Sequence, residues 1–111
     1  MPFRPSSITI HPWIQEKFDK IDELSAKDQQ PAKAIAKGIR TAVARIKADG
    51  QWGEVIPPGS IPKVYIQTLG VRNLYCADLP AFHRMFYTIR DRDVIIIDLV
   101  DHVEYDRLMR T

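Results

Sequence analysis

Residues 73–100 read NLYCADLPAFHRMFYTIRDRDVIIIDLV, and this stretch decides the fold. Runs rich in β-branched and aromatic residues lie on either side of a short polar turn, which is the pattern of an antiparallel hairpin. The strands predicted here are residues 73–79, 82–90 and 94–100. Residues 94–97 are all apolar, so we expect the last strand to be central in the sheet and covered on both faces.

Two amphipathic helices are expected on the N-terminal side of these strands. Ile14, Phe18 and Ile21 recur at helical spacing, which predicts a first helix over residues 12–24. A second helix is predicted over residues 28–49. The apolar positions of the second helix fall on one face and its basic positions on the other, so we expect a helical hairpin lying across one side of the sheet.

The fold class predicted from this order is α+β. An N-terminal helical hairpin packs on a three- to four-stranded antiparallel sheet, and a short C-terminal helix follows from residue 101. Residues 51–62 are rich in Gly and Pro and predict a loop, whereas residues 63–69 fit either a short helix or an edge strand. The chain has 111 residues, so residues 1–111 are assigned to one small domain. The positions predicted to be buried are Ile35, Ile39, Ile46, Ile89, Ile95 and Ile97.

The composition is that of an ordinary globular protein, with 45% hydrophobic and 27% charged residues. No stretch is long enough to span a bilayer, and the N-terminus lacks a basic segment followed by an apolar run. A cytoplasmic protein without membrane contact is therefore the simplest expectation. Cys76 is the only cysteine and the three histidines are scattered, so we expect neither a disulfide nor a metal site.

The net charge of +2 is a weak argument for nucleic-acid binding, but the distribution of charge is more informative. Residues 29–48 contain five basic residues and no acidic one. The residues expected to contact RNA are Lys33, Lys37, Arg40, Lys63 and Arg72. The alternative for each is a solvated surface charge, and for most of them composition favours that alternative.

The C-terminal third of the chain resembles a known family. Residues 84–89, RMFYTI, look like the Tyr-Arg-hydrophobic-hydrophobic-Tyr strand of the RelE/ParE superfamily of type II toxin–antitoxin toxins. Residues 94–100 resemble the hydrophobic strand that follows, and residues 101–105, DHVEY, resemble the family's histidine-and-tyrosine tail motif. Before residue 73 the resemblance is one of topology alone.

The resemblance implies a RelE-like endoribonuclease that cleaves mRNA, associated with the ribosome. In such a reaction the RNA 2′-hydroxyl attacks the adjacent phosphorus and a 5′-hydroxyl leaves, without a metal or another cofactor. A cognate antitoxin protein is the implied partner, and a homo-oligomer is left open. The catalytic residues implied are Arg84, His102 and Tyr105.

His102 follows a strand expected to be buried and sits where the chain should reach the surface. An imidazole titrates near neutral pH and can act as general acid or base. From the residues alone, a structural or surface histidine beside acidic neighbours is the favoured alternative. The resemblance reverses that preference, because a histidine near this point takes part in RNA cleavage in some RelE-like toxins.

Arg84 and Tyr105 have competing interpretations as well. Strand alternation points Arg84 and Phe86 to one face and Met85 to the other, so Arg84 can reach a phosphate from a concave sheet face. The alternative is an ion pair with Asp78 or Asp98. Tyr105 can orient the RNA by stacking or hydrogen bonding, or it can simply anchor the C-terminal tail to the sheet.

One departure from the family leaves other functions open. RelE ribonucleases carry lysines along the strand that corresponds to residues 73–79, and here that strand has no lysine and one aspartate, Asp78. Either His102 takes the role of general base, or the nuclease is weak or inactive. The rivals are therefore a ParE-like toxin that poisons DNA gyrase and a non-catalytic binding module on the same fold.

Overall fold

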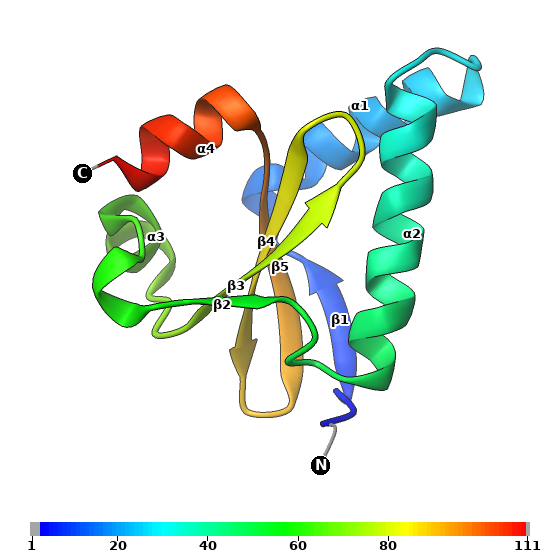
Figure 1. Ribbon diagram of the computed structural model, residues 1–111. Helices are drawn as coiled ribbons and strands as arrows, with labels where there is room; N and C mark the ends of the chain where they lie inside the picture. Colours follow the sequence, from blue (N-terminus) through cyan, green and yellow to red (C-terminus); the bar gives the residue numbers. More distant parts are fainter. Residues whose placement is uncertain (1–2, 111) are drawn as a thin grey trace.

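The computed structural model describes residues 3–110, which form an α+β fold around one sheet (Figure 1). In this part of the chain the sheet has five strands in the order β1-β5-β4-β3-β2. The strands are β1 (Ser7–Ile10), β2 (Glu54–Ile56), β3 (Leu74–Leu79), β4 (His83–Arg90) and β5 (Asp93–Asp101). The helices are α1 (Gln15–Ala26), α2 (Ala32–Ala48), α3 (Lys63–Leu69) and α4 (His102–Met109), with short 3-10 turns at Pro12–Ile14 and Pro58–Ser60.

The three predicted strands correspond to β3, β4 and β5, but the prediction of a three- to four-stranded antiparallel sheet is wrong. The sheet is mixed, because β1 pairs with β5 in parallel, while β2 adds an antiparallel edge to β3. β1 has four residues and β2 three, and β2 lies in the Gly- and Pro-rich segment predicted to be a loop. Strands this short give too few alternating positions to be recognised from sequence.

The two N-terminal helices form the expected hairpin with shifted bounds. The first begins as a 3-10 turn and continues as α1 to Ala26. The second begins at Ala32 rather than at residue 28, because Asp28 adopts a left-handed conformation with φ 60°, which a helix cannot contain. The segment left open between helix and edge strand is the helix α3, which stands between β2 and β3. The helices are thus interleaved with the strands rather than gathered at the two ends of the chain.

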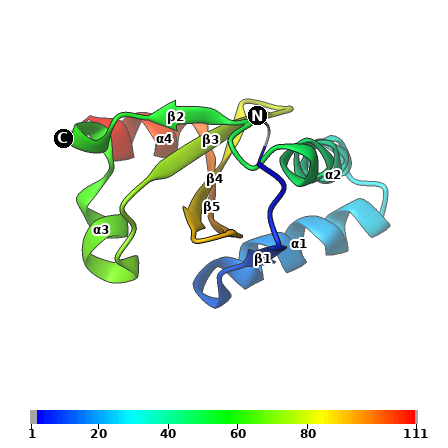
Figure 2. The same cartoon turned by 90° about the horizontal axis from the view of Figure 1, so that it is seen from below.

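The sheet has two covered faces, which we call the hairpin face and the tail face. Figure 2 shows α1 and α2 on the hairpin face, with α3 and α4 on the tail face. The hairpin face buries Ile35 and Ile46 of α2 against Met85 and Tyr87 of β4. The tail face buries a second cluster, which includes Tyr65, Leu74, Cys76, Phe86, Ile97 and Val100. Alternation along β4 therefore divides its side chains between two cores.

Three of the six positions predicted to be buried are fully buried. Ile35, Ile46 and Ile97 are buried. The other three, Ile39, Ile89 and Ile95, are half-buried at the rims of the two clusters. β5 lies between β1 and β4, so the prediction that it is central is confirmed. No helix within residues 3–110 is long and apolar enough to cross a membrane.

A buried carboxylate joins the two layers of helices through the sheet. Asp98 of β5 is 5% exposed. Its Oδ1 accepts a hydrogen bond of 3.0 Å from Lys17 Nζ of α1, and its Oδ2 accepts one of 2.6 Å from the Tyr65 hydroxyl of α3. A bulge in the β4–β5 register, between Phe86 and Tyr87, lies next to this position. The charge is satisfied from both sides, as a buried carboxylate requires.

Candidate functional site

Arg84 sits on the tail face of β4, directly across from Asp78 of β3 in the strand register. Its Nε lies 3.4 Å from Asp78 Oδ1, so the ion pair considered from the sequence is present. The Asp78 side chain is 78% exposed, and an ion pair in that setting is screened by water and weak. The guanidinium is therefore held near the sheet surface without being locked there.

The second partner of Arg84 is Tyr105 of α4. The guanidinium carbon lies 4.1 Å from the centroid of the Tyr105 ring, which is a cation–π contact. Tyr105 in turn stacks on the buried Phe86, with ring centroids 5.8 Å apart and planes at 10°. Burial raises the pKa of the Tyr105 phenol, while the charge of Arg84 acts to lower it. Tyr105 thus anchors the tail to the sheet and lies against Arg84, as the packing interpretation expects.

His102 is the first residue of α4 and is exposed. The helix is capped by Asp101, whose Oδ1 accepts a 2.8 Å hydrogen bond from the Glu104 backbone N–H. That bond lowers the pKa of the Asp101 carboxyl. The His102 ring meets the ring of Phe82 edge-on, with centroids 5.6 Å apart. The cap therefore fixes where the chain leaves the sheet and so where His102 is presented.

A surface hollow of about 340 Å³ brings Arg84 and His102 together. Its lining comes from the β3–β4 turn, the first part of β4 and the start of α4. Figure 1 shows that turn and the start of α4 at the same end of the sheet. The other lining residues are Asp78, Leu79, Ala81, Phe82 and His83. A guanidinium and an imidazole thus share one solvent-open depression.

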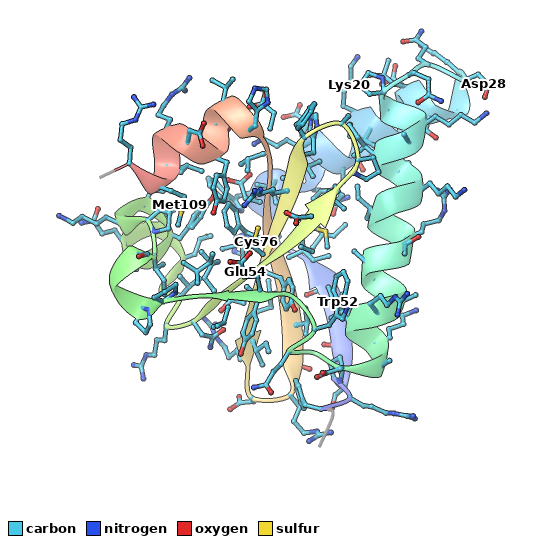
Figure 3. All side chains as sticks on the ribbon, viewed as in Figure 1. Lys20, Asp28, Trp52, Glu54, Cys76 and Met109 are labelled. Atoms are coloured by element: carbon cyan, nitrogen blue, oxygen red, sulfur yellow. The ribbon has the colours of Figure 1, made fainter. Side chains whose placement is uncertain are left out.

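Two carboxylates on the tail face were not singled out from the sequence as site residues. Glu54 of β2 pairs with Cys76 of β3, and Asp78 follows on the same face of β3 (Figure 3). Glu54 lay in the predicted loop, and only the strand pairing brings it to this face. Burial raises the pKa of the Cys76 thiol to about 11, so the thiol is neutral at physiological pH. The thiol is therefore not a proton acceptor beside Arg84.

The residues predicted to bind RNA do not form one surface with Arg84. Lys33 and Arg40 are exposed on α2, and Lys33 Nζ lies 2.6 Å from Asp28 Oδ1. Lys63 lines a depression near the end of α4, and Arg72 lines another beside the β4–β5 turn. Lys37 is the exception, because it shares a groove of about 370 Å³ with Asp78, the partner of Arg84.

Lys17 lines a different depression, to which His83 contributes as well as to the hollow of Arg84 and His102. The depression at Lys17 measures about 470 Å³ and lies between α1 and the end of β5. Lys17 Nζ is already bonded to Asp98 and to the Leu99 carbonyl, both at 3.0 Å. These contacts join α1 to the sheet, so Lys17 has a structural role here. No group of three or more His, Cys, Asp or Glu side chains among residues 3–110 is arranged to hold a metal ion.

No protein-family model, no curated protein and no solved structure matches the chain.

Proposed function

We propose that this protein is a RelE-like endoribonuclease that cleaves single-stranded mRNA, associated with the ribosome, at the hollow between Arg84 and His102. The observation that carries the proposal is the joint presence of a guanidinium and an exposed imidazole in one depression of about 340 Å³. These two groups supply what transesterification of RNA needs from a protein: positive charge at the phosphate and a site of proton transfer.

Arg84 is the phosphate ligand in this mechanism. Its ion pair with the exposed Asp78 is weak, so an RNA phosphate can take the place of that carboxylate. A guanidinium presents its donors in a fork that fits two phosphate oxygens. Tyr105 holds the guanidinium in place from the other side through its ring. As the phosphorus becomes five-coordinate, negative charge builds up on its oxygens, so this contact strengthens and stabilises the transition state.

His102 transfers the proton. The RNA 2′-hydroxyl attacks the adjacent phosphorus, the bond to the 5′-oxygen breaks, and the products carry a 2′,3′-cyclic phosphate and a 5′-hydroxyl. Protonated His102 gives its proton to the leaving 5′-oxygen. Asp78, released from Arg84 by the phosphate, receives the proton of the 2′-hydroxyl. The reaction as proposed requires no metal or other cofactor.

The test is expression of the protein in bacterial cells, followed by mapping of mRNA ends by primer extension. We expect growth arrest and new 5′ ends within coding regions. His102→Ala should reduce cleavage by about 10²–10⁴-fold, the usual loss on removing a general acid or base. His11→Ala, at a histidine beside the first 3-10 turn, is the matched control and should cleave like wild type. Intact mRNA, or a His102 variant as active as wild type, contradicts the proposal.

A non-catalytic binding module is the second candidate, and the pairing of Arg84 favours it. Arg84 is already engaged by Asp78 and Tyr105, as expected if its role were to hold the tail against the sheet. The His102→Ala variant separates the two candidates. A nuclease would lose cleavage of bound RNA, whereas a binding module would keep its RNA affinity and would show no cleavage even as wild type. Gyrase poisoning, the third possibility, would appear as DNA breaks with mRNA left intact.

The proposed partner besides mRNA is a cognate antitoxin that blocks the hollow, and the proposed location is the cytoplasm. A small reading frame next to the gene, with a DNA-binding pattern in its product, would support this pairing. Co-expression of that product should restore growth.

A further inference from the structure

We propose that the β3–β4 turn is a nucleobase platform, on which Phe82 stacks an unpaired base of the RNA while Arg84 holds a neighbouring phosphate. This inference deepens the proposed function and rests on it, because it assigns the substrate contact beside the reacting phosphate. Phe82 is 78% exposed, the most exposed of the large hydrophobic side chains in residues 3–110. An aromatic ring so open to water gains little for the fold itself.

The backbone of the turn points to a role for Phe82 other than stability. Ala81 and Phe82 both have left-handed backbones, with φ of 60° and 58°. Turns with two such central residues strongly prefer Asn-Gly or Asp-Gly, because glycine has no Cβ and Asn and Asp tolerate the left-handed region better than other residues. A phenylalanine in that position is thus unfavourable for the turn, and the ring is presented to solvent in spite of it. Strained residues of this kind gather at binding and catalytic sites.

The surroundings of the ring fit a nucleotide better than a protein. Phe82 lines the same hollow as Arg84 and His102, and its ring meets the His102 ring at 5.6 Å. Protein-binding patches continue as contiguous apolar surface, whereas here the neighbours in the hollow include Asp78 and His83 as well as the cation. Aromatic rings beside a cationic phosphate ligand are the usual means of holding single-stranded RNA.

The test measures binding to a short single-stranded RNA whose riboses are 2′-O-methylated, so that attack by the 2′-hydroxyl cannot occur. Fluorescence anisotropy gives the dissociation constant for wild type and for Phe82→Gly and Phe82→Tyr. Loss of one stacked base weakens binding by about 5- to 150-fold. We expect this loss for Phe82→Gly and a near-normal affinity for Phe82→Tyr, which keeps the ring. Val64→Ala, at an exposed residue of α3 outside this hollow, is the control and should bind like wild type.

Thermal unfolding of the same variants separates binding from folding. Glycine relieves the left-handed strain at position 82, so Phe82→Gly should melt about 2–8 °C higher than wild type while binding RNA more weakly. A structural phenylalanine would instead give a lower melting temperature. Equal RNA affinity of wild type and Phe82→Gly, or no RNA binding by wild type, overturns the platform.

The platform and the nuclease fail separately. If wild type cleaves ordinary RNA but Phe82→Gly binds the methylated RNA as tightly, the platform is wrong and the nuclease stands. If binding depends on Phe82 but ordinary RNA stays intact, the platform stands and the nuclease is wrong. If Phe82→Gly loses the antitoxin but not RNA, the ring is a protein contact and the platform is overturned.

Discussion

The two faces of the sheet differ in how completely helices cover them. The hairpin face is closed by α1 and α2 over a cluster of apolar side chains, and the α2 residues Ile35 and Ile46 are 1% and 0% exposed. The tail face has a comparable core around Phe86, but the α4 side chains that pack on it, Tyr105, Leu108 and Met109, are only partly buried. At its open end lie the exposed Asp78, the half-buried Arg84 and the strained turn that carries Phe82.

The difference separates residues that hold the fold from residues that are available for binding. On the hairpin face nearly every inward side chain is satisfied by apolar contact. On the tail face a cation is paired with a weakly held carboxylate, an imidazole is exposed, and an aromatic ring is presented to water. Such features add little to stability, and they are the ones a ligand can use. The comparison predicts large stability effects and small activity effects on the first face, and the reverse on the second.

The largest stability effect is expected at Ile46 of α2. Truncation to alanine removes a side chain that is 0% exposed and leaves a cavity between α2 and the sheet. Ile46→Ala should lower the free energy of unfolding by about 2–5 kcal/mol in urea denaturation. Val55→Ala, at a residue that is 58% exposed, is the control and should change it by less than about 0.5 kcal/mol. Similar values for the two would mean that burial under α2 does not set the stability of the fold.

A smaller loss is expected where the two faces are joined. Tyr65→Phe keeps the ring but removes the hydroxyl that donates to Asp98 Oδ2. The buried carboxylate then lacks one partner, and the free energy of unfolding should fall by about 1–3 kcal/mol. Tyr75→Phe, at a half-buried ring stacked on Tyr87, is the matched control. Urea denaturation of both variants provides the comparison, and a neutral Tyr65→Phe would mean that the bond to Asp98 is dispensable.

The smallest effect is a pH dependence at the start of α4. Hydrogen bonding to the Glu104 N–H lowers the folded-state pKa of Asp101 below its unfolded value. The sign follows from linkage: this stabilisation is present above the unfolded pKa and is lost as pH falls through the lower folded pKa. Asp101→Asn keeps a capping side chain without a titrating group. Its melting temperature should therefore decline less steeply than that of wild type below about pH 4; parallel declines would contradict the assignment.

Much of the fold was predictable because long periodic segments carry strong signals. The three strands β3, β4 and β5 and the amphipathic character of α1 and α2 follow from spacing alone. β1 and β2 could not be predicted in this way. Each is stabilised by pairing with a strand distant in sequence, and each is too short for a hydrophobic pattern of its own to be recognised. The start of α2 was misplaced because the left-handed backbone at Asp28 has no clear sequence signature.

The candidate site was predictable only where local pattern sufficed. Alternation along β4 placed Arg84 on one face with Phe86, as observed. The hollow itself depends on how α4 leaves the sheet, and Glu54 reaches the tail face through a strand that was not expected. Phe82 was predicted to be the first residue of a strand and was not considered as a site residue. The Pro-Ala-Phe-His turn offered a signal, because an exposed aromatic in a tight turn that lacks glycine is unusual.

Arg84 provides the most direct test of whether the tail face is the functional one. Arg84→Ala should cleave RNA about 10²–10³-fold more slowly than wild type, the usual loss of a transition-state contact, while its free energy of unfolding changes by less than about 1 kcal/mol. Lys33→Ala on α2 should cleave like wild type at saturating RNA and only weaken the salt dependence of binding. Cleavage rates of purified, folded proteins at equal concentration decide the matter. If Arg84→Ala cleaves as fast as wild type, the tail face is not the site of the reaction.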